Sequence, residues 1–494
     1  MLKDNKNRKE RFIMKKVFKK GVSVSLALIL SVGLLSGCGG KDEAENVVSD
    51  EAILNVDENA PVTISIGQWP TREGKDMDRM NKRKEEFEKL YPNITIEPDT
   101  WKYDVKTFYP KAQAGLLPTV FDAHFTELEK LKVGGYVADL TAVLEKENML
   151  DKLNPQLREL LTKDGRLYAL PMNAYVHGLA YNTDLFEKAG YLAGDGTPTA
   201  PKTWDEVREF AKQIKEKTGV AGFAIPTINN CGGWMFSEIA WSYGVDFMEQ
   251  QEDGSWKATF DSPECVEALQ LIKDMKWVDK SMPENGLIGL DDYYQLYGSG
   301  QVGMIIGAND GIANAAVNYE MNKDHVGMVD MPSGPSKKVG LLGGALKCIA
   351  GNSTPEQIVA AVKWIEFLGI TPDIGEEAKV NSEEDMKSNA ELGKPIGGYT
   401  YQVWTGDSEK TTFALGLVDK YRNVNVNHFK LYNDSMLKGT VEIQPEEPVE
   451  CQSLYAILDS CIQSVLTDEN ADCAKIVKEA NEEFQTNVLD NLEY

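Results

Sequence analysis

The sequence predicts an α/β protein whose first strands form a largely parallel sheet. Residues 62–70 alternate apolar and polar side chains and then reach a loop marked by Gly and Pro, as a strand followed by a turn does. A charged stretch follows in which apolar residues recur at helical spacing up to Tyr91-Pro92, and residues 94–98 (ITIEP) are a second strand. Helical crossovers of this length join parallel strands.

The next elements continue the same rhythm. A helix is expected over 104–114, a turn over 115–118 and a short strand over 119–125 (TVFDAHF). Further along, helix starts are indicated by their capping residues. These are Thr203 with Glu206, Ser262 followed by Pro263, and Thr354 with Pro355 and Gln357.

The C-terminal part is again helical in pattern, from 454 to 489, with a break near 468–470. Two acidic stretches, 375–395 and 444–450, are interpreted as solvated loops. The chain from Pro61 onward has about 430 residues, which is enough for two substantial lobes.

The N-terminal segment has the layout of a secretory signal. Four lysines between 15 and 20 precede an apolar run over 22–35, which is shorter than the roughly 20 residues that span a bilayer. The residues Leu35-Ser36-Gly37-Cys38 resemble a bacterial lipobox, which implies cleavage before Cys38 and lipid attachment to its sulfur. The alternative is an ordinary signal peptide with an incidental cysteine. Translation starts at Met1 or at Met14.

Residues 38–60 are acidic and nearly free of aromatic side chains, which predicts a disordered tether. Removal of residues 1–37 leaves 43 basic and 75 acidic residues, a net charge of −32. Such a charge argues against nucleic acid as a partner and against adhesion of the protein body to an anionic membrane, because both interactions need clustered cations. Contact with the membrane is therefore expected through the lipid anchor only.

Cysteine and histidine give no metal signature. Six cysteines follow Cys38 with no CxxC spacing, and the four histidines are far apart in sequence. Six cysteines in so large a chain are sparse for a disulfide scaffold, so most are interpreted as small buried apolar residues. No cofactor and no metal are expected.

Several segments in order resemble the carbohydrate-type extracellular solute-binding proteins of ABC importers, the maltose-binding-protein-like family. The most specific are DGRLYALPMNAYVHGLAYNTDLFEKAG and PKTWDEVREFAKQI. Others are FEKLYPNITIEPDTW, AQAGLLPTVFDAHFTELEKLKVGGYVADLTAVL, SGQVGMIIGANDG and the stretch from VGMVDMPSGPSKK to WIEFLG. The similarity covers most of 61–369.

The resemblance implies a two-lobed, periplasmic-binding-protein-like (type II) α/β fold with the ligand in a cleft between the lobes. Lobe one is expected over 61–171 with 344–371, and lobe two over 172–343 with 372–494. Family layout implies that ligand binding closes the lobes and that a permease recognises the closed form. A ligand that touches both lobes has higher affinity for the closed state and so shifts the population towards it.

A sugar site needs flat aromatic side chains beside Asp, Asn and backbone groups, on loops at the carboxyl ends of strands. The resemblance and these loops together give the candidates Trp69, Asp122, His124, Asn173, Tyr175, Asn229, Asn230, Trp234, Asn309, Asp310 and Gly344. Gly343 and Gly344 are expected to allow close backbone approach at the second crossover. For Asp122 a helix cap is an equal alternative, for His124 a structural role is favoured, and for Trp234 the alternative is a buried core position.

The sequence thus predicts a lipid-anchored extracellular protein that captures a carbohydrate, expected to be an oligosaccharide, and delivers it to the permease subunits of an ABC importer. We expect it to be a monomer. We also expect that it is not an enzyme, because no nucleophile elbow, metal motif or phosphate loop is evident. The alternatives are the same fold with a peptide or an anion as ligand, a surface-anchored carbohydrate-active enzyme, and a purely structural or adhesive lipoprotein. The ligand-like cleft segments argue against the last of these.

Overall fold

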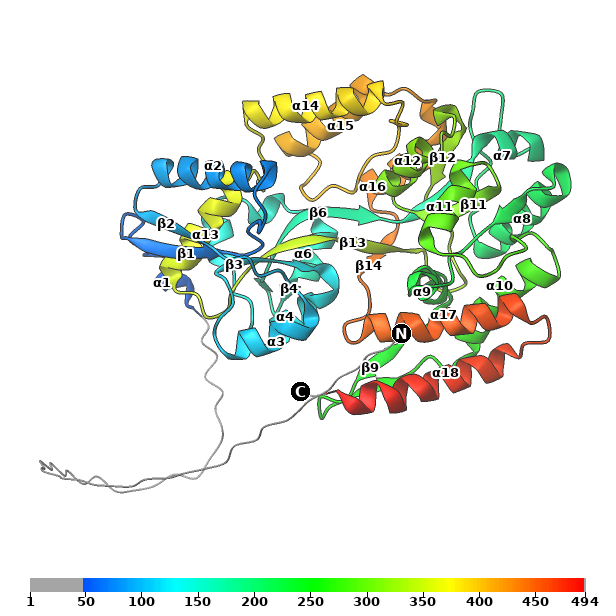
Figure 1. The fold of residues 1–494 in the computed structure, drawn as a ribbon, viewed down its shortest axis with the longest axis horizontal. Coiled ribbons are helices and arrows are strands. Elements are labelled where there is room, and N and C mark those ends of the chain that lie inside the picture. Colours follow the sequence, from blue (N-terminus) through cyan, green and yellow to red (C-terminus); the bar gives the residue numbers. More distant parts are fainter. Residues whose placement is uncertain (1–47, 493–494) are drawn as a thin grey trace, which may run out of the picture. The chain divides into compact units, whose positions relative to one another are not determined.

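The computed structural model describes residues 48–492. Two mixed sheets carry helices around them, and several segments pass between the sheets (Figure 1). We call the first sheet with its helices lobe one and the second sheet with its helices lobe two. The expected signal peptide, Cys38 and the first part of the expected tether lie outside the described residues.

Lobe one is built on a six-stranded sheet. Its order is β14-β13-β3-β1-β2, and β6 also pairs with β13. The strands are β1 (Val62–Ile66), β2 (Ile94–Pro98), β3 (Val120–His124), β6 (Leu170–Val176), β13 (Val339–Ile349) and β14 (Glu442–Gln444). Alternation along β1 buries Ile64 and Ile66 on the core face, as the sequence pattern predicts.

Lobe two is built on a four-stranded sheet of order β12-β7-β11-β8. These strands are β7 (Gly178–Asn182), β8 (Ala221–Phe223), β11 (Val302–Gly307) and β12 (Val326–Val329). Short two-stranded pairs complete the described strands: β4 (Thr162–Lys163) with β5 (Arg166–Leu167), and β9 (Met248–Gln250) with β10 (Trp256–Ala258).

The expected parallel pairing is confirmed for the first strands, and it does not extend to the later strands of the two sheets. β1 is parallel to β2 and β3, as the helical crossovers require. β13, however, is antiparallel to β3 and β6, and β7 is antiparallel to β11 and β12. β6 carries the chain from lobe one into lobe two and β13 carries it back, so these two neighbouring strands run in opposite directions.

Two of the passages between the lobes are strands. β6 continues through His177 into β7 of the second sheet, and β13 runs in the opposite direction beside β6. The expected crossover points, 171/172 and 343/344, fall within β6 and β13. A further passage follows β14, whose end leads through 445–450 into α17 (Cys451–Thr467) of lobe two. β14 pairs with β13 and so belongs to the first sheet.

The helices of lobe one are α1 (Asp50–Leu54), α2 (Lys75–Leu90), α3 (Val105–Gln113), α4 (Leu128–Val133), α5 (Thr141–Lys146), α6 (Pro155–Leu161) and α13 (Pro355–Phe367). The capping box expected at Thr354 is confirmed, because its hydroxyl accepts from Gln357 N and the Gln357 amide accepts from Thr354 N. α13 then packs on the first sheet, where Trp364 meets Phe87 of α2 edge to face at 5.1 Å.

The helices on the lobe-two side are α7 (Thr183–Ala189), α8 (Trp204–Thr218), α9 (Cys231–Tyr243), α10 (Pro263–Trp277), α11 (Leu290–Gly298), α12 (Asn309–Asn318), α14 (Glu376–Glu391), α15 (Glu409–Tyr421), α16 (Lys430–Lys438), α17 and α18 (Cys473–Asn487). Ser262 caps α10 as expected, and the break between α17 and α18 is where the sequence places it. At α8, Thr203 accepts from Glu206 N as expected, but the Glu206 carboxylate accepts from Lys202 N rather than from Thr203 N.

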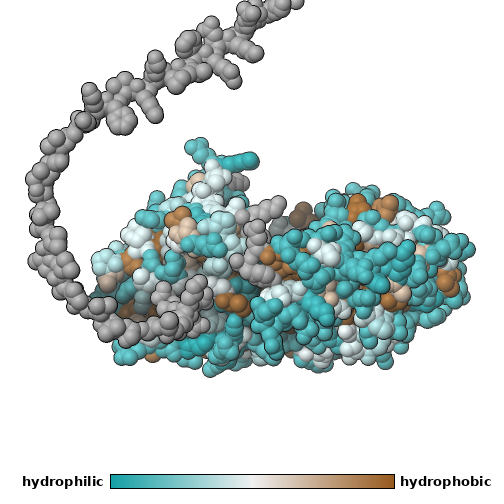
Figure 2. All heavy atoms as spheres, turned by 90° about the horizontal axis from the view of Figure 1, so that it is seen from below, coloured by the Kyte–Doolittle hydropathy of each residue, from teal (hydrophilic) through white to brown (hydrophobic). Residues whose placement is uncertain are grey.

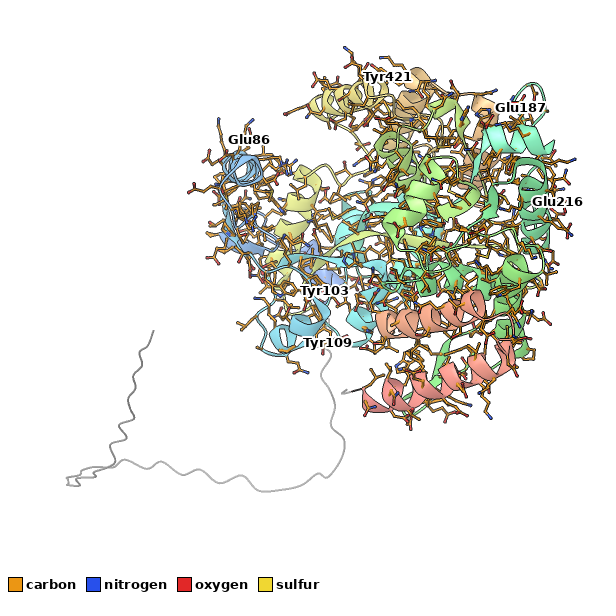
Figure 3. The ribbon with its side chains drawn as sticks, turned by 45° about the vertical axis from the view of Figure 1, so that its right-hand side comes forward. Glu86, Tyr103, Tyr109, Glu187, Glu216 and Tyr421 are labelled. Carbon is orange, nitrogen blue, oxygen red and sulfur yellow. The ribbon has the colours of Figure 1, made fainter. Side chains whose placement is uncertain are left out.

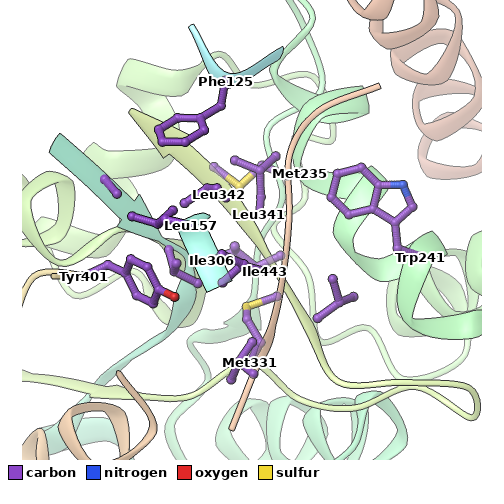
Figure 4. Packing of buried hydrophobic residues seen from close by; sticks show 14 of the residues in the cluster. Phe125, Leu157, Met235, Trp241, Ile306, Met331, Leu341, Leu342, Tyr401 and Ile443 are labelled. Atoms are coloured by element: carbon purple, nitrogen blue, oxygen red, sulfur yellow. The ribbon is translucent and has the colours of Figure 1, made fainter. Parts of the chain in front are cut away.

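The interior at the crossing strands is continuous between elements of both lobes. Leu341 and Leu342 of β13 and Ile443 of β14 lie between Met235 and Trp241 of α9 on one side and the ring of Tyr401 on the other (Figure 4). Trp241 is fully buried. The outer face in Figure 2 is mostly hydrophilic, with hydrophobic residues in small separate patches.

Both acidic stretches interpreted as solvated loops differ from that interpretation. Residues 376–391 form α14, a helix with no buried residue, so no apolar periodicity marks it in the sequence. Ion pairs with α15 hold it, among them Lys420 with Glu383 and Lys379 with Glu409. In the second stretch, Glu447 is only 9% exposed and Trp241 donates its indole N–H to it at 2.9 Å.

The described part of the expected tether is ordered, which corrects that expectation for residues 48–60. Ser49 caps α1 by accepting from Ala52 N at 3.2 Å, and Ile53 is buried against α5 and α13. Glu58 forms ion pairs with Lys146 and Lys363, and these pairs lower the pKa of its carboxyl to about 2. The acidic residues that indicate a solvated chain in the sequence therefore find basic partners on lobe one.

Candidate functional site

A cavity of about 500 Å³ opens between the two lobes. Lobe one contributes residues from the β2–α3 loop and from the end of β3, and lobe two contributes the first turns of α9 and α17. The passage segments add one residue of β6 and one that follows β14. The lining residues are Tyr103, Asp104, His124, Thr126, Glu127, Tyr175, Asn229, Asn230, Cys231, Trp234, Glu446, Cys451, Gln452 and Tyr455.

The lobe-one wall is centred on Tyr103 and Glu127. The Tyr103 hydroxyl donates to Glu127 Oε2 at 2.9 Å, and the His124 ring meets the Tyr103 ring edge to face at 6.4 Å. Burial, and then the Glu127 charge, raise the pKa of Tyr103 well above its ordinary value, so the phenol stays a hydrogen-bond donor. Figure 3 shows Tyr103 on the side of lobe one that faces α17.

The lobe-two wall depends on the close packing of α9 against α17. Asn229 and Asn230 adopt left-handed backbone conformations (φ 60° and 67°), which turn the chain sharply into α9. Asp459 of α17 then accepts from Asn230 N at 2.8 Å and from Gly233 N at 2.7 Å. This carboxyl caps the N-terminus of α9 from outside the helix and fixes the turn from which Trp234 projects.

Aromatic rings form the wall on the side of the passage strands. Trp234 is half-buried, and its ring centroid lies 5.0 Å from that of His177 at an interplanar angle of 71°. The Tyr175 ring stacks on the same imidazole, with a centroid distance of 5.8 Å and an angle of 22°. Burial raises the pKa of Tyr175 to about 12. Tyr175 and Trp234 thus offer flat apolar surfaces and polar edges to the cavity.

Glu446 and Tyr455 close the inner part of the cavity, and sequence reasoning missed both. Tyr455 is 1% exposed and lies near the Glu446 carboxyl; burial raises the pKa of both groups. The signal that could have found Glu446 is Pro445-Glu446-Glu447-Pro448 directly after a short strand. Prolines on both sides of two acidic residues favour a fixed extended passage over an open acidic loop.

The cavity is acidic. Carboxylates of Asp104, Glu127 and Glu446 line it, and its lining residues, all within the described part of the chain, include no Lys or Arg. Outside the lining, the Lys130 amine lies 3.8 Å from Glu127. A ligand with a net negative charge would therefore meet carboxylates in the lining and no cation among the lining residues.

Five of the predicted site residues line this cavity: His124, Tyr175, Asn229, Asn230 and Trp234. Trp69 lies in the core of lobe one at 3% exposure, because the left-handed turn at Gln68 directs the chain back and Trp69 N donates to Asp99 O. Asp122 is neither a helix cap nor a lining residue. It lies in β3 and pairs with Lys347 directly opposite on β13.

The remaining predicted residues do not line the cavity either. Asn173 accepts from Ala345 N at 3.1 Å, and Asn309 donates to Gly398 O at 3.0 Å. Asp310 is exposed, although its charge contributes to the raised pKa of Tyr175.

Gly343 and Gly344 of β13 lie where the passage strands touch. A Cβ at Gly343 would overlap the Tyr175 ring, and one at Gly344 (φ 142°) would overlap Asn173 O. The expected close approach is therefore present.

No group of three or more His, Cys, Asp or Glu residues is arranged to hold a metal ion within residues 48–492. Over the same residues, no helix is both long and apolar enough to cross a membrane. The six cysteines after Cys38 are unpaired; four are buried, while Cys231 and Cys451 line the cavity.

The chain is similar to several curated proteins over part of their length. A binding protein of Brucella abortus is 30% identical over 183 residues, 36% of this chain and 41% of that protein. The arabinooligosaccharide-binding protein of Halalkalibacterium halodurans is 28% identical over 158 residues, 32% of this chain and 33% of that protein. The sn-glycerol-3-phosphate-binding periplasmic protein UgpB of Brucella abortus is 25% identical over 350 residues, 66% and 75% of the two chains. The match with the first of these thus spans less than half of the relative's length.

Solved structures share the fold at low sequence identity. Maltose-bound MalE3 of T. maritima superposes with a TM-score of 0.56 at 22% identity, over 86% of this chain and 100% of that one. The cyclic alpha-maltosyl-1,6-maltose binding protein of Arthrobacter globiformis gives 0.60 at 19%, over 88% and 100%. The two-lobed, type II periplasmic-binding-protein-like α/β fold is therefore confirmed. The family described as bacterial extracellular solute-binding protein matches residues 72–369, more than half of the chain, and this protein belongs to that family.

Proposed function

We propose that the chain captures a neutral carbohydrate in the cavity between its lobes and delivers it to the permease of an ABC importer. The observation that carries this proposal is the composition of the cavity. Flat rings of Trp234 and Tyr175 stand beside hydrogen-bonding groups of Asn229, Asn230 and Gln452. Sugars present apolar C–H faces and hydroxyl groups, which need this combination of surfaces.

The cavity's charge distinguishes the sugar from the alternative ligands. Among the relatives, one is named for arabinooligosaccharides and another for sn-glycerol-3-phosphate. A phosphate is bound best by a cation, and the cavity lining has no Lys or Arg. Asp459 already occupies N–H groups at the start of α9, whereas the start of α17 has no side-chain cap. An uncharged saccharide is compatible with Asp104, Glu127 and Glu446, whose oxygens accept from hydroxyl groups. A volume of about 500 Å³ accommodates more than one sugar ring, which favours an oligosaccharide.

Capture follows from the two-walled site. A ligand that contacts Tyr103 and Glu127 on one lobe and Trp234 on the other gains more contacts when the lobes approach each other. Its affinity is then higher for the closed state, and binding shifts the population towards closure. We infer that the protein binds its ligand without turnover, as a monomer that meets the permease in the closed state.

The proposal places the protein outside the cell membrane, held by lipid on Cys38. The lipobox-like residues 35–38 and the family's extracellular character support this location. Cys38→Ala should release the protein from the membrane fraction or leave it unprocessed. Unchanged membrane retention and unchanged processing would contradict the lipid anchor.

The test of the ligand class is a thermal-shift screen of residues 38–494 with Cys38→Ser, which retains α1. Neutral mono- and oligosaccharides, sn-glycerol-3-phosphate and short peptides are compared. A ligand at a hundredfold excess over its Kd stabilises the native state by about 2.7 kcal/mol. A shift with a neutral glycan that is recovered intact supports the proposal. A shift only with the phosphate or a peptide would overturn the ligand class, and cleavage of the glycan would overturn the binding role.

Trp234→Ala then tests the site itself. Loss of the stacking surface should weaken glycan binding at least about tenfold, or roughly 1.4 kcal/mol. Trp256→Ala is the matched control, because Trp256 is also half-buried but lies on β10, outside the cavity lining. Equal affinities of wild type and Trp234→Ala would contradict the assignment.

A further inference from the structure

His177 and Glu238 form a buried pair directly behind the cavity. His177 is 2% exposed and Glu238 is fully buried. Nδ1 of His177 lies 2.6 Å from Glu238 Oε1, and Glu238 Oε2 accepts from Leu341 N at 2.9 Å. The pair therefore connects the junction of β6 and β7, helix α9 and strand β13, which are three segments that meet where the chain passes between the lobes.

The His177 ring supports the two aromatic residues that face the ligand space. It meets Trp234 at 5.0 Å nearly edge to face and lies against Tyr175 at 5.8 Å nearly parallel. On β13, Gly343 stands in register with Tyr175, and any Cβ there would overlap the Tyr175 ring. Tyr175 is thus confined between a glycine and an imidazole, and Trp234 has His177 at its back and the cavity in front.

The hydrogen bonds of the buried pair indicate that it sets the orientation of the His177 ring. A buried carboxylate is costly to desolvate, and apolar side chains of the same volume fill a core equally well. Here both Glu238 oxygens are used, one for the imidazole and one for the backbone of β13, so the plane of the His177 ring is fixed relative to the passage strand. An apolar residue could fill the space but could not set this angle.

We propose that His177, held by Glu238, is a positioning residue that orients Trp234 and Tyr175 for ligand binding. His177 does not line the cavity, so it acts through these two rings and not by contact with the ligand. This inference rests on the proposed function, since it assigns the two rings to a sugar.

The first test needs no ligand. The emission of Trp234 is obtained as the difference between each protein and its Trp234→Phe counterpart, with acrylamide as quencher. In His177→Leu the indole loses its edge contact, so its emission should change and its quenching should increase. Glu238→Leu should have the same effect, while Glu238→Gln, which retains an acceptor for Leu341 N and a hydrogen-bonding group for His177, should resemble wild type. Unchanged Trp234 emission in both leucine variants would overturn the inference whatever the ligand is.

The second test is a double-mutant cycle on glycan affinity, measured by calorimetry. His177→Leu should weaken binding by about fivefold or more, and the loss should largely vanish in the Trp234→Ala background, because contacting residues are energetically coupled. Independent effects of the two substitutions would overturn the inference. If wild type binds no glycan, the proposed function fails, and the emission test still decides the positioning role.

The matched control is His428→Leu. His428 is likewise buried, at 6% exposure, but lies next to α16, away from the cavity lining. Its replacement should lower the thermal midpoint and leave glycan affinity unchanged. If His177→Leu fails to fold, His177→Gln keeps a hydrogen-bonding group toward Glu238 and removes the ring, and the same two measurements apply to it. A His177 variant that matched this control, with lower stability and wild-type affinity, would show a merely structural role.

Discussion

Glu447 gives a stability test that depends on pH. Its carboxyl is 9% exposed and accepts from Trp241 Nε1 at 2.9 Å, yet burial outweighs this hydrogen bond and raises its pKa from 4.5 to about 7. Below pH 4.5 the group is protonated in both the folded and the unfolded state. Between pH 4.5 and 7 the unfolded chain releases its proton while the folded chain retains it, so the folded state loses stability as the pH rises.

The magnitude follows from the pKa difference. Each pKa unit corresponds to about 1.36 kcal/mol, so the full difference amounts to roughly 3 kcal/mol, and local relaxation reduces it to about 2. Glu447→Gln removes the titration and retains an acceptor for Trp241. We expect similar stability of the two proteins at pH 4 and a more stable variant at pH 8. With an unfolding entropy of about 2.1 cal/mol/K per residue, the difference corresponds to a midpoint shift of roughly 2–3 °C for this chain.

The assay is differential scanning calorimetry of both proteins at pH 4, 5.5, 7 and 8. The matched control is Glu469→Gln in the exposed turn between α17 and α18, which should show no such trend. The difference between Glu447→Gln and wild type must grow between pH 4.5 and 7 and then level off. A difference that is constant with pH, or a variant that is less stable at pH 8, would refute the argument that burial dominates at Glu447.

Three further substitutions test other parts of the fold. Gly343→Ala should force the Tyr175 ring to move, which should lower the free energy of unfolding by about 1–3 kcal/mol. Thermal unfolding measures this loss, and glycan binding should weaken as well. Lys347→Met should cost about 3 kcal/mol in chemical unfolding, because it leaves Asp122 half-buried and unpaired, and adding Asp122→Leu should recover most of the loss. Glu58→Gln should cost about 1 kcal/mol at pH 7, since the partly exposed ion pairs are screened, and the cost should decrease as the pH falls from 4.5 toward 2.

Each of these three has a contrary outcome. A wild-type melting curve and affinity for Gly343→Ala would mean that the passage strands have room for a methyl group. If the double variant Lys347→Met with Asp122→Leu stays as unstable as Lys347→Met alone, the lost stability does not come from the unpaired Asp122 carboxylate. A cost at position 58 that increases at low pH would contradict the sign of the pKa shift.

The sequence was sufficient where local chemistry decides the structure. Thr354 with Gln357, and Ser262 before Pro263, start helices because their side chains satisfy backbone groups within one turn. The alternation of apolar and polar residues predicts β1 for a similar reason. Ile64 and Ile66 lie on the same face of the strand, and this face packs on the core. Turn-forming Asn229 and Asn230 beside Trp234 likewise indicated a loop with an aromatic residue, and all three line the cavity.

Long-range packing decides the features that the sequence did not reveal. Glu446 and Glu447 are acidic in a stretch that resembles a surface loop, but Glu447 is buried and Glu446 is partly buried in the cavity wall. Helix α14 has no apolar stripe, because ion pairs and not a buried face hold it. Trp69 was expected at the ligand, but the left-handed turn at Gln68, invisible to periodicity, directs it into the core.

The two unpaired thiols of the cavity have a practical consequence. Thiolate, not thiol, reacts with oxidants and alkylating reagents, and burial raises the pKa of Cys451 to about 12 and also raises that of Cys231. The Cys451 thiol is therefore protonated at neutral pH and reacts slowly with oxidants. A maleimide fluorophore added at mildly alkaline pH should therefore label Cys231 first. A dye attached there would lie at the mouth of the ligand space and would convert the protein into an optical sensor for whatever it binds.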